Sequence, residues 1–302
     1  MVQKIFQWDW EDLEVQLSRT FSPAAPVERS DFFYGRRPIM RRLMDAANQA
    51  GQHAIIYGER GVGKTSLTNV LSSYLRPFTS ETIASARVNC YGETTYTQIW
   101  NSLFDQVGLP SASEYHALTL NDVFRTLREE DSRKLILIVD EFDRIQDPDI
   151  DVLFADTVKT LSDFSLDTTL IFVGVADDVD DLISEHESIN RSLVQIHLPR
   201  MTVDELGDIV NFGIEKVGME VSAEAVSQIC SISLGLPNYA HALGLAAGRA
   251  AIDRRSRSIE TGDVAEAIRS LTLESQQTVI RAFDLATASP RRQNFYFQVL
   301  LA

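Results

Sequence analysis

The octapeptide GERGVGKT, residues 58–65, constrains the fold of this chain more than any other feature. It matches the pattern G-x-x-x-x-G-K-[ST], in which glycines let backbone N–H groups converge on phosphate oxygens. A short apolar run, 54–57, precedes it, and apolar residues follow at helical spacing: Leu67, Val70, Leu71, Tyr74 and Leu75. The segment therefore predicts a strand, a phosphate-binding loop and a helix whose positive end faces the phosphates.

Each part of such a loop has its own expected task. The predicted nucleotide-binding residues are Gly58, Arg60, Gly61, Val62, Gly63, Lys64, Thr65 and Ser66. Lys64 is expected to bridge the β- and γ-phosphates as a catalytic residue, and Thr65 to bind Mg²⁺ through its hydroxyl. The loop thus predicts ATP and Mg²⁺ as ligands.

A second acidic motif lies in the segment KLILIVDEFDRI. It places Asp140 and Glu141 at the C-terminal end of an apolar run, and ligands of parallel sheets bind at that end of the strands. Asp140 is expected to hold the Mg²⁺ shell, and Glu141 to polarise a water for in-line attack on the γ-phosphate. Together with Lys64, this motif predicts ATP hydrolysis.

Short β-type runs alternate with helical segments between residues 31 and 200. The runs cover residues 54–57, 84–88, 135–139, 169–175 and 194–198. Continuous apolar strands separated by helices indicate a parallel sheet covered on both faces. After Pro199 the strands stop, and residues 202–205 form a capping box that begins a helix.

Four segments follow from this pattern. Residues 1–30 are expected to be irregular, because Pro23 and Pro26 interrupt regular structure. An α/β nucleotide-binding domain is expected over 31–200 and an all-helical lid over 201–272. Residues 273–302 are expected to form a C-terminal helical segment.

Charge limits the partners that the whole chain can attract. The 302 residues carry a formal net charge of −15, which repels phosphate backbones. DNA contact would need a local arginine patch, and the alternative is that these patches are solvated helix faces: Arg36, Arg37, Arg41 and Arg42; Arg254, Arg255 and Arg257; Arg291 and Arg292.

The location inside the cell is predicted from cysteines and hydropathy. Cys90 and Cys230 lie in apolar contexts without metal or redox spacing, which is typical of a reducing compartment. No apolar run approaches the ~18 residues of a membrane span, and the N-terminus is acidic and aromatic. We therefore expect a cytoplasmic protein without a membrane partner.

With these motifs in place, the chain resembles the AAA+ ATPases over about residues 32–271, most closely the origin-recognition and initiator clade. The segment FFYGRRPIMRR resembles that clade's adenine-side box, which implies that Tyr34 and Arg36 contact the nucleotide. LILIVDEFDRI resembles its Walker B strand. The resemblance implies a five-stranded parallel sheet in order 5-1-4-3-2, sandwiched by helices and followed by a helical lid. It also implies homo-oligomers, as rings or filaments, with ATP at the subunit interfaces.

The resemblance implies roles for two further positions. Asp177 stands where the family keeps a polar sensor of the γ-phosphate; a carboxylate there can orient a water, and the alternative is that it caps a helix. Arg191 aligns with the arginine finger that completes a neighbouring subunit's site, and the alternative is a surface arginine. Arg200 is a second candidate for the finger.

The lid departs from the usual family pattern at Gly235-Leu236-Pro237-Asn238, which lacks a sensor arginine. This stretch resembles the Gly-x-Pro motif of STAND-type regulatory NTPases, which implies that Pro237 lies against the adenine. The departure favours slow hydrolysis and nucleotide-dependent assembly. Residues 273–302 resemble the start of a winged-helix DNA-binding domain, and the alternative is a terminal helix packed on the lid.

The main hypothesis is an ATPase that binds ATP-Mg at subunit interfaces and hydrolyses it slowly. Assembly-dependent hydrolysis would regulate or remodel a DNA- or protein-bound complex, with a partner protein involved. The alternative is a STAND-type signalling switch with slow turnover. A loader that delivers a partner enzyme to DNA shares the chemistry of the first hypothesis.

Overall fold

The computed structural model describes two compact units that interleave along the chain. The residues that it describes are 2–23, 36–75, 83–111, 117–130, 133–176 and 191–273. The α/β unit comprises residues 24–208 and 234–238, and the helical unit comprises 1–23, 209–233 and 239–302. The chain therefore leaves the α/β unit near residue 208, returns to it for five residues, and leaves again.

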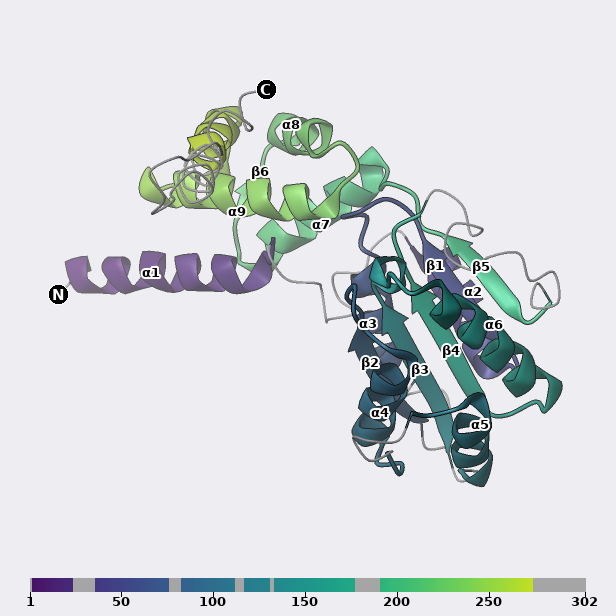
Figure 1. The fold of residues 1–302 in the computed structure, drawn as a ribbon. Helices are drawn as coiled ribbons and strands as arrows, with labels where there is room; N and C mark the ends of the chain where they lie inside the picture. The colour runs from purple at the N-terminus through teal and green to yellow at the C-terminus, as the bar shows by residue number, and fades with distance from the viewer. Residues whose placement is uncertain are drawn as a thin grey trace, which may run out of the picture. The chain divides into compact units, whose positions relative to one another are not determined.

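A five-stranded parallel sheet forms the centre of the α/β unit (Figure 1). Its strands are β1 His53–Tyr57, β2 Ile83–Asn89, β3 Lys134–Asp140, β4 Thr168–Val173 and β5 Leu193–His197. Their order is β2-β3-β4-β1-β5, and every neighbouring pair is parallel. This is the predicted order 5-1-4-3-2 read from the other edge, so the fold prediction is confirmed. The central strands are buried on both faces, which explains their unbroken apolar sequences.

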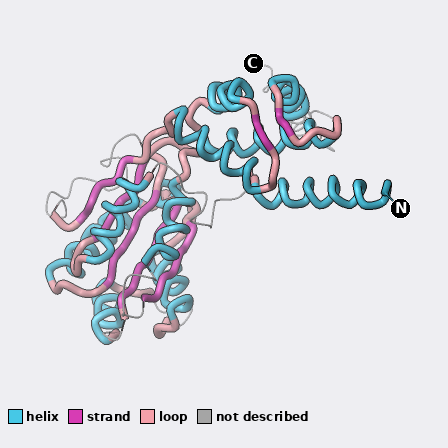
Figure 2. Tube along the Cα trace, turned by 180° about the vertical axis from the view of Figure 1, so that it is seen from behind, coloured by secondary structure: helices cyan, strands magenta, loops and turns pink. Residues whose placement is uncertain are grey.

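Helices cover both faces of this sheet (Figure 2). They are α2 Arg37–Asn48, α3 Lys64–Leu75, α4 Tyr96–Val107, α5 Leu120–Glu129 and α6 Pro148–Asp163. Leu43 of α2 and Leu71 of α3 belong to the core on one face. Trp100 of α4 and Phe154 of α6 belong to the core on the other, with their rings stacked 6.1 Å apart. The sheet is therefore sandwiched, with its carboxyl edge free to carry polar residues.

Side-chain caps fix where several helices begin. Thr95 and Thr119 each form a capping box at the start of α4 and α5. The box predicted at 202–205 also forms: the Thr202 N–H donates to Glu205 Oε2, and the Glu205 N–H donates to Thr202 Oγ1. It begins α7 Val203–Lys216, the helix along which the chain passes from the α/β unit into the helical unit.

The helical unit contains short strands that sequence analysis did not expect. Its helices include α8 Ala223–Ser233, most of α9 Pro237–Asp253, and a helix over 261–273. Two-residue strands β6 Glu220–Val221 and β7 Ser258–Ile259 pair in parallel. The prediction of an entirely helical segment after residue 200 is therefore wrong at these four residues, because two turns between helices meet and exchange backbone hydrogen bonds.

The N-terminal segment is also more regular than predicted. Residues Val2–Thr20 form helix α1. Pro23 follows this helix and therefore does not interrupt it. Leu13, Leu17 and Phe21 recur every four residues and are buried, so tertiary packing supports the helix. The expectation of an irregular segment over 1–30 is wrong for this part.

Glycines make room for α1 within the helical unit. A Cβ atom on Gly213 would lie 2.5 Å from Phe21 Cζ, and one on Gly244 would lie 2.8 Å from Phe21 Cε1. Leu17 packs in the same way against Gly248, at 2.6 Å from a Cβ on that residue. Distances below 3 Å leave no space for a methyl group, so these glycines determine where α1 packs.

The described residues contain no helix long and apolar enough to cross a membrane. Cys90 and Cys230 are buried and form no disulfide bond. Burial, together with the charges of Asp140, Glu141 and Asp143, raises the pKa of Cys90 to about 12. Burial therefore keeps the thiol of Cys90 protonated near neutral pH.

Candidate functional site

The phosphate-binding loop follows β1 and has a backbone that requires glycine. Gly58, Gly61 and Gly63 have φ angles of +143°, +86° and +99°. A Cβ on Gly58 would lie 2.4 Å from the carbonyl oxygen of Leu198. The loop leads directly into α3, which begins at Lys64. This close turn before a helix N-terminus creates the concave backbone that the sequence motif predicts.

Lys64 holds its ammonium group against this loop. Its side chain is largely buried, and Nζ donates hydrogen bonds to the carbonyl oxygens of Gly58 (2.7 Å) and Glu59 (2.8 Å). Burial lowers the pKa of Lys64, while the charges of Asp143 and Asp140 partly oppose the shift. A cation and a helix N-terminus therefore meet at one place, and this arrangement fits a polyphosphate.

Thr65 and Asp140 meet at the carboxyl edge of the sheet. The Thr65 hydroxyl donates to Asp140 Oδ2 at 2.9 Å, although the residues are 75 positions apart. Asp140 ends β3 and is 2% exposed, and its Oδ1 accepts the Glu141 N–H at 2.8 Å. A hydroxyl beside a carboxylate is the oxygen donor set that Mg²⁺ prefers. These two residues therefore fit the predicted metal site.

Glu141 lies next to that pair in an unusual backbone conformation. Its φ is 55°, in the left-handed region, and a 3-10 helix over Phe142–Arg144 follows it. Its side chain is about half exposed, and Oε2 accepts a hydrogen bond from Arg144 Nη1 at 2.8 Å. The carboxylate is thus accessible beside Asp140, as a group that activates water must be.

Arg87 is a residue of this site that sequence analysis missed. It lies on β2, and its Nη2 is 2.5 Å from Asp140 Oδ2 while its Nη1 donates to Asn69 Oδ1 of α3 at 2.6 Å. The register pairs Arg87 with Ile138, two residues before Asp140 on β3. The arginine in the strand Ile83–Asn89 was the available signal, but its partner can be identified only once β2 and β3 are paired.

Arg36 supplies a buried guanidinium beside the loop. It is 2% exposed, and Nη2 donates to the carbonyl oxygen of Pro199 at 2.9 Å. Nη1 is buried without a hydrogen-bond partner and lies 3.8 Å from a Cβ placed on Gly63. Burial lowers the pKa of Arg36 to about 10, partly opposed by the charge of Glu205. A cation with an unused donor here fits an anionic ligand.

The segment 234–238 belongs to the α/β unit and lies against the loop. A Cβ on Gly61 would lie 3.7 Å from Leu236 and 3.6 Å from Asn238, and one on Gly63 would lie 3.9 Å from Pro237. Pro237 is therefore beside the phosphate-binding loop.

Arg200 and Arg191 occupy different ends of the sheet. Arg200 is ion-paired with Glu59 of its own chain's loop. Arg191 is exposed and precedes β5, and its carbonyl accepts a hydrogen bond from Gln52 at the start of β1. A five-residue strand spans roughly 16 Å, so Arg191 lies at the edge opposite its own loop. Arg191 therefore lies away from the phosphate-binding loop of its own chain.

Some of the remaining predicted residues are described by the structure and others are not. Arg60 is exposed, Val62 is fully buried in the core, and Ser66 lies in the first turn of α3. Val62 therefore offers only its backbone to a ligand. Tyr34, Asp177 and the segment 274–302 lie outside the described residues.

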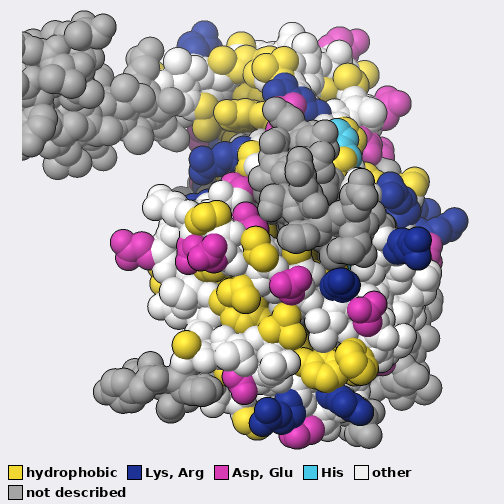
Figure 3. All heavy atoms as spheres, turned by 45° about the vertical axis from the view of Figure 1, so that its right-hand side comes forward, with side chains coloured by type: hydrophobic (Ala, Val, Ile, Leu, Met, Phe, Trp, Pro, Cys, Tyr) yellow, Lys and Arg dark blue, Asp and Glu magenta, His cyan; other side chains and the backbone are white. Residues whose placement is uncertain are grey.

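The arginine patches are partly used within the fold. Arg36 is buried, Arg42 donates to the carbonyl of Gln195, and Arg254 is paired with Asp263. On the face shown in Figure 3, cationic and anionic side chains are interspersed. This pattern does not form a field of one sign on that face.

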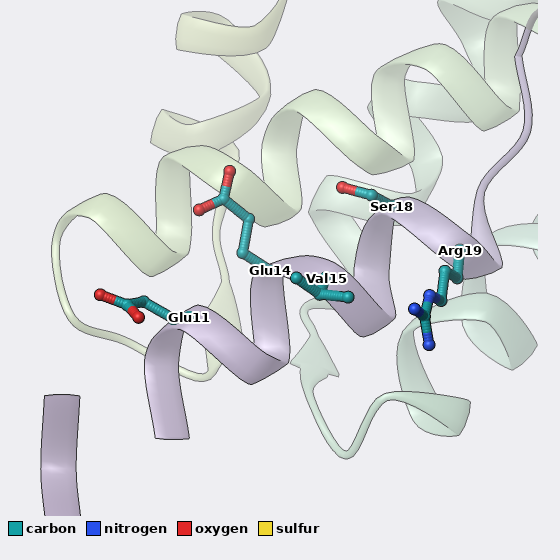
Figure 4. A pocket seen from close by; sticks show the side chains of 5 residues that line it. All are labelled: Glu11, Glu14, Val15, Ser18 and Arg19. Carbon is teal, nitrogen blue, oxygen red and sulfur yellow. The ribbon is translucent and has the colours of Figure 1, made fainter. Parts of the chain in front are cut away.

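A separate open pocket lies along α1 in the helical unit (Figure 4). It has a volume of about 520 Å³ and is lined by Glu11, Glu14, Val15, Ser18 and Arg19. It shares no residue with the phosphate-binding loop, and its two glutamates disfavour an anionic ligand.

Comparison with known proteins agrees with this geometry. Residues 47–183 match the family model described as the AAA domain. Among curated proteins, no sequence matches the chain.

Solved structures share the fold at low sequence identity. The Aeropyrum pernix ORC2 protein, solved as ADPNP-ADP complexes, is 18% identical over 84% of this chain and 71% of its own, with a TM-score of 0.63. The A. pernix ORC1 protein, solved in complex with DNA, is 18% identical over 82% and 68%, with a TM-score of 0.61. A Walker-type ATPase of Pyrococcus abyssi is 17% identical over 88% and 82%, also at 0.61.

Proposed function

Because residues 47–183 of this chain match the AAA domain model and its five-stranded parallel sheet has the order β2-β3-β4-β1-β5, we propose that it is an ATPase whose hydrolysis depends on assembly with further copies. The observation that carries the proposal is the convergence of Lys64, Thr65, Asp140 and Glu141 at one edge of the sheet. The substrate is ATP, and the products are ADP and phosphate.

Each side chain has a defined task in this reaction. Lys64 exchanges its two carbonyl partners for oxygens of the β- and γ-phosphates. Thr65 and Asp140 would hold Mg²⁺, which would supply positive charge to neutralise the phosphate oxygens. Glu141 accepts a proton from water as the water oxygen bonds to the γ-phosphorus, and the bond to the β–γ bridging oxygen breaks. Arg36 offers its unused donor to the nucleotide.

Assembly enters through Arg191. Its place at the amino edge of β5 prevents contact with its own loop, so its charge can stabilise the transition state only in a neighbouring subunit. The ATP site would then lie at an interface between copies in a ring or filament. We place the protein in the cytoplasm, a proposal supported by two buried cysteines that form no disulfide bond.

The client of the ATPase is a DNA- or protein-bound complex that the cycle regulates or remodels, together with a partner protein. The solved relatives include a protein in complex with DNA, and this supports a DNA-bound client. The net charge of −15 favours a contact made through a partner or a local patch.

A second candidate function is a STAND-type switch in which nucleotide exchange signals and hydrolysis is slow. The place of Pro237, 3.9 Å from a Cβ on Gly63, favours it. In this function, turnover would not depend on Arg191.

The deciding experiment measures ATPase rate against protein concentration for the wild type, Glu141→Gln and Arg191→Ala. Assembly-dependent hydrolysis predicts a rate per subunit that rises with concentration and is lost in each variant. A mixture of the two variants should regain activity, because a Glu141→Gln subunit can supply Arg191 to an intact neighbouring site. A concentration-independent rate that Arg191→Ala leaves unchanged would favour the switch. Absence of nucleotide binding in the wild type would reject both.

A further inference from the structure

The carboxylate of Asp140 has more partners than its proposed metal role requires. Its Oδ2 accepts from both Thr65 Oγ1 (2.9 Å) and Arg87 Nη2 (2.5 Å), while Oδ1 accepts from the Glu141 N–H (2.8 Å). Asp140 is buried, so these contacts are poorly screened by solvent. The positively charged guanidinium of Arg87 therefore contacts the same Asp140 oxygen, Oδ2, that Thr65 contacts.

Arg87 is not needed to orient this carboxylate. The Thr65 hydroxyl and the Glu141 N–H already hold one oxygen each, from α3 and from the residue that follows β3. Two such contacts fix the plane and the direction of a carboxylate. What Arg87 adds is charge: it neutralises the one anionic group that sequence and geometry assign to Mg²⁺.

Asn69 also contacts the Arg87 guanidinium, but one of the three guanidinium nitrogens has no hydrogen-bond partner. Nη1 donates to Asn69 of α3, and the buried Nε has no hydrogen-bond partner. The Arg87 side chain is 26% exposed at the edge strand β2, whereas Asp140 is almost fully enclosed. Arg87 can therefore move toward solvent without opening the core, and Asp140 cannot.

We propose that Arg87 is an internal counter-cation of the metal site, which occupies Asp140 in the metal-free protein and must release it before Mg²⁺ binds. This inference rests on the proposed nucleotide site. Mg²⁺ and Arg87 compete for one carboxylate, so the guanidinium weakens metal binding while leaving the phosphate-binding loop intact. The protein should accordingly hold ADP without metal and require an elevated Mg²⁺ concentration to complete the site.

The test uses a fluorescent ADP analogue, titrated first in EDTA and then with Mg²⁺. Arg87→Met keeps an unbranched, flexible side chain similar to the aliphatic stem of arginine and removes the charge. Its affinity for metal-free ADP should stay within about twofold of the wild type. Its half-saturating Mg²⁺ concentration should fall about tenfold, as expected on losing one charged hydrogen bond.

Arg133→Met is the matched control. Arg133 has a similarly exposed side chain, 25%, and is also ion-paired, with Glu130, but it does not contact Asp140. Its half-saturating Mg²⁺ concentration should equal that of the wild type. Arg87→Gln, which keeps a polar side chain on β2, provides the measurement if Arg87→Met does not fold.

The outcomes separate this inference from the proposed function. If the wild type binds ADP and Lys64→Ala does not, the nucleotide site stands. If the half-saturating Mg²⁺ concentration of the folded Arg87 variant is unchanged or higher, the counter-cation proposal is wrong while the proposed function stands. A higher concentration would indicate that Arg87 instead positions Asp140 for the metal. If the wild type binds no ADP under either condition, the proposed function itself fails.

Discussion

Arg200 is bound to Glu59 through both carboxylate oxygens. Arg200 Nη2 lies 2.6 Å from Glu59 Oε2, and Nε lies 3.1 Å from Oε1. The hydrogen bonds from Arg200 lower the pKa of Glu59. Arg200 Nη1 also donates to the carbonyl of Leu234 at 3.2 Å, so one side chain connects the phosphate-binding loop to the segment 234–238.

This connection predicts that Arg200→Ala weakens ADP binding by about three- to tenfold. Without Arg200, the Glu59 carboxylate adds uncompensated negative charge beside the phosphates, and because both groups are exposed the effect is moderate. Adding Glu59→Gln to Arg200→Ala should restore most of the affinity. Fluorescence titration at low and high salt checks this; an Arg200→Ala defect that the second substitution leaves unchanged would contradict it.

Gly58 and Gly61 should respond differently to alanine. A methyl group on Gly58 meets the Leu198 carbonyl at 2.4 Å, so Gly58→Ala should cost more than about 3 kcal/mol of folding free energy. On Gly61 the nearest atom is 3.6 Å away and only the positive φ is strained, at about 1–2 kcal/mol. Urea unfolding of both variants measures the difference. Equal losses would show that the 2.4 Å contact relaxes freely.

Local patterns predicted the sheet and the residues around its loop. The three central strands β1, β3 and β4 are mostly apolar runs, and Lys64, Thr65 and Asp140 belong to short motifs, so neither required knowledge of the tertiary fold. Arg87 was missed because its partner depends on the pairing of β2 with β3.

Tertiary packing also explains the error at the N-terminus. Helix α1 carries a weak apolar pattern in sequence, and its stability depends on Leu17 and Phe21 entering space left by distant glycines. Prolines downstream were a stronger local signal, but they lie beyond the end of the helix. Sequence periodicity does not report such long-range contacts.

The left-handed backbone of Glu141 predicts a conflict between stability and activity. Its φ of 55° disfavours a residue with a Cβ, so Glu141→Gly should be more stable than Glu141→Gln by about 1 kcal/mol. Both variants lose the ion pair with Arg144, so the difference between their unfolding free energies reports mainly the backbone conformation at residue 141. Both should lose hydrolysis by about 100-fold or more while binding ATP. Unfolding curves and ATPase rates test the two parts separately.

The packing of α1 predicts a paired rescue. Gly213→Ala places a methyl group 2.5 Å from Phe21 Cζ, so it should destabilise the docked helix by about 1–3 kcal/mol. Phe21→Leu in the same chain removes the clashing end of the ring and should recover part of that loss. Proteolysis of the N-terminal segment, with hydrogen exchange over residues 10–20, reports whether α1 stays docked. If Gly213→Ala leaves the hydrogen-exchange protection of residues 10–20 unchanged, the contact between Gly213 and Phe21 does not determine where α1 packs.

His53 predicts loss of stability in mild acid. It is fully buried on β1, its Nδ1 accepts the Leu170 N–H at 3.0 Å, and burial lowers its pKa to about 4. The unfolded chain protonates this histidine near its usual pKa of 6.5, whereas the folded chain keeps it neutral. The contribution is therefore complete above pH 6.5 and falls as the pH drops toward 4, by about 3 kcal/mol in total. Urea unfolding between pH 7.5 and 4.5 should show a shallower pH dependence for His53→Asn than for the wild type. Ile171→Val, a packing change in the neighbouring strand, should lower stability by about 1 kcal/mol equally at every pH. If His53→Asn keeps the full wild-type slope, the acid sensitivity arises from other groups.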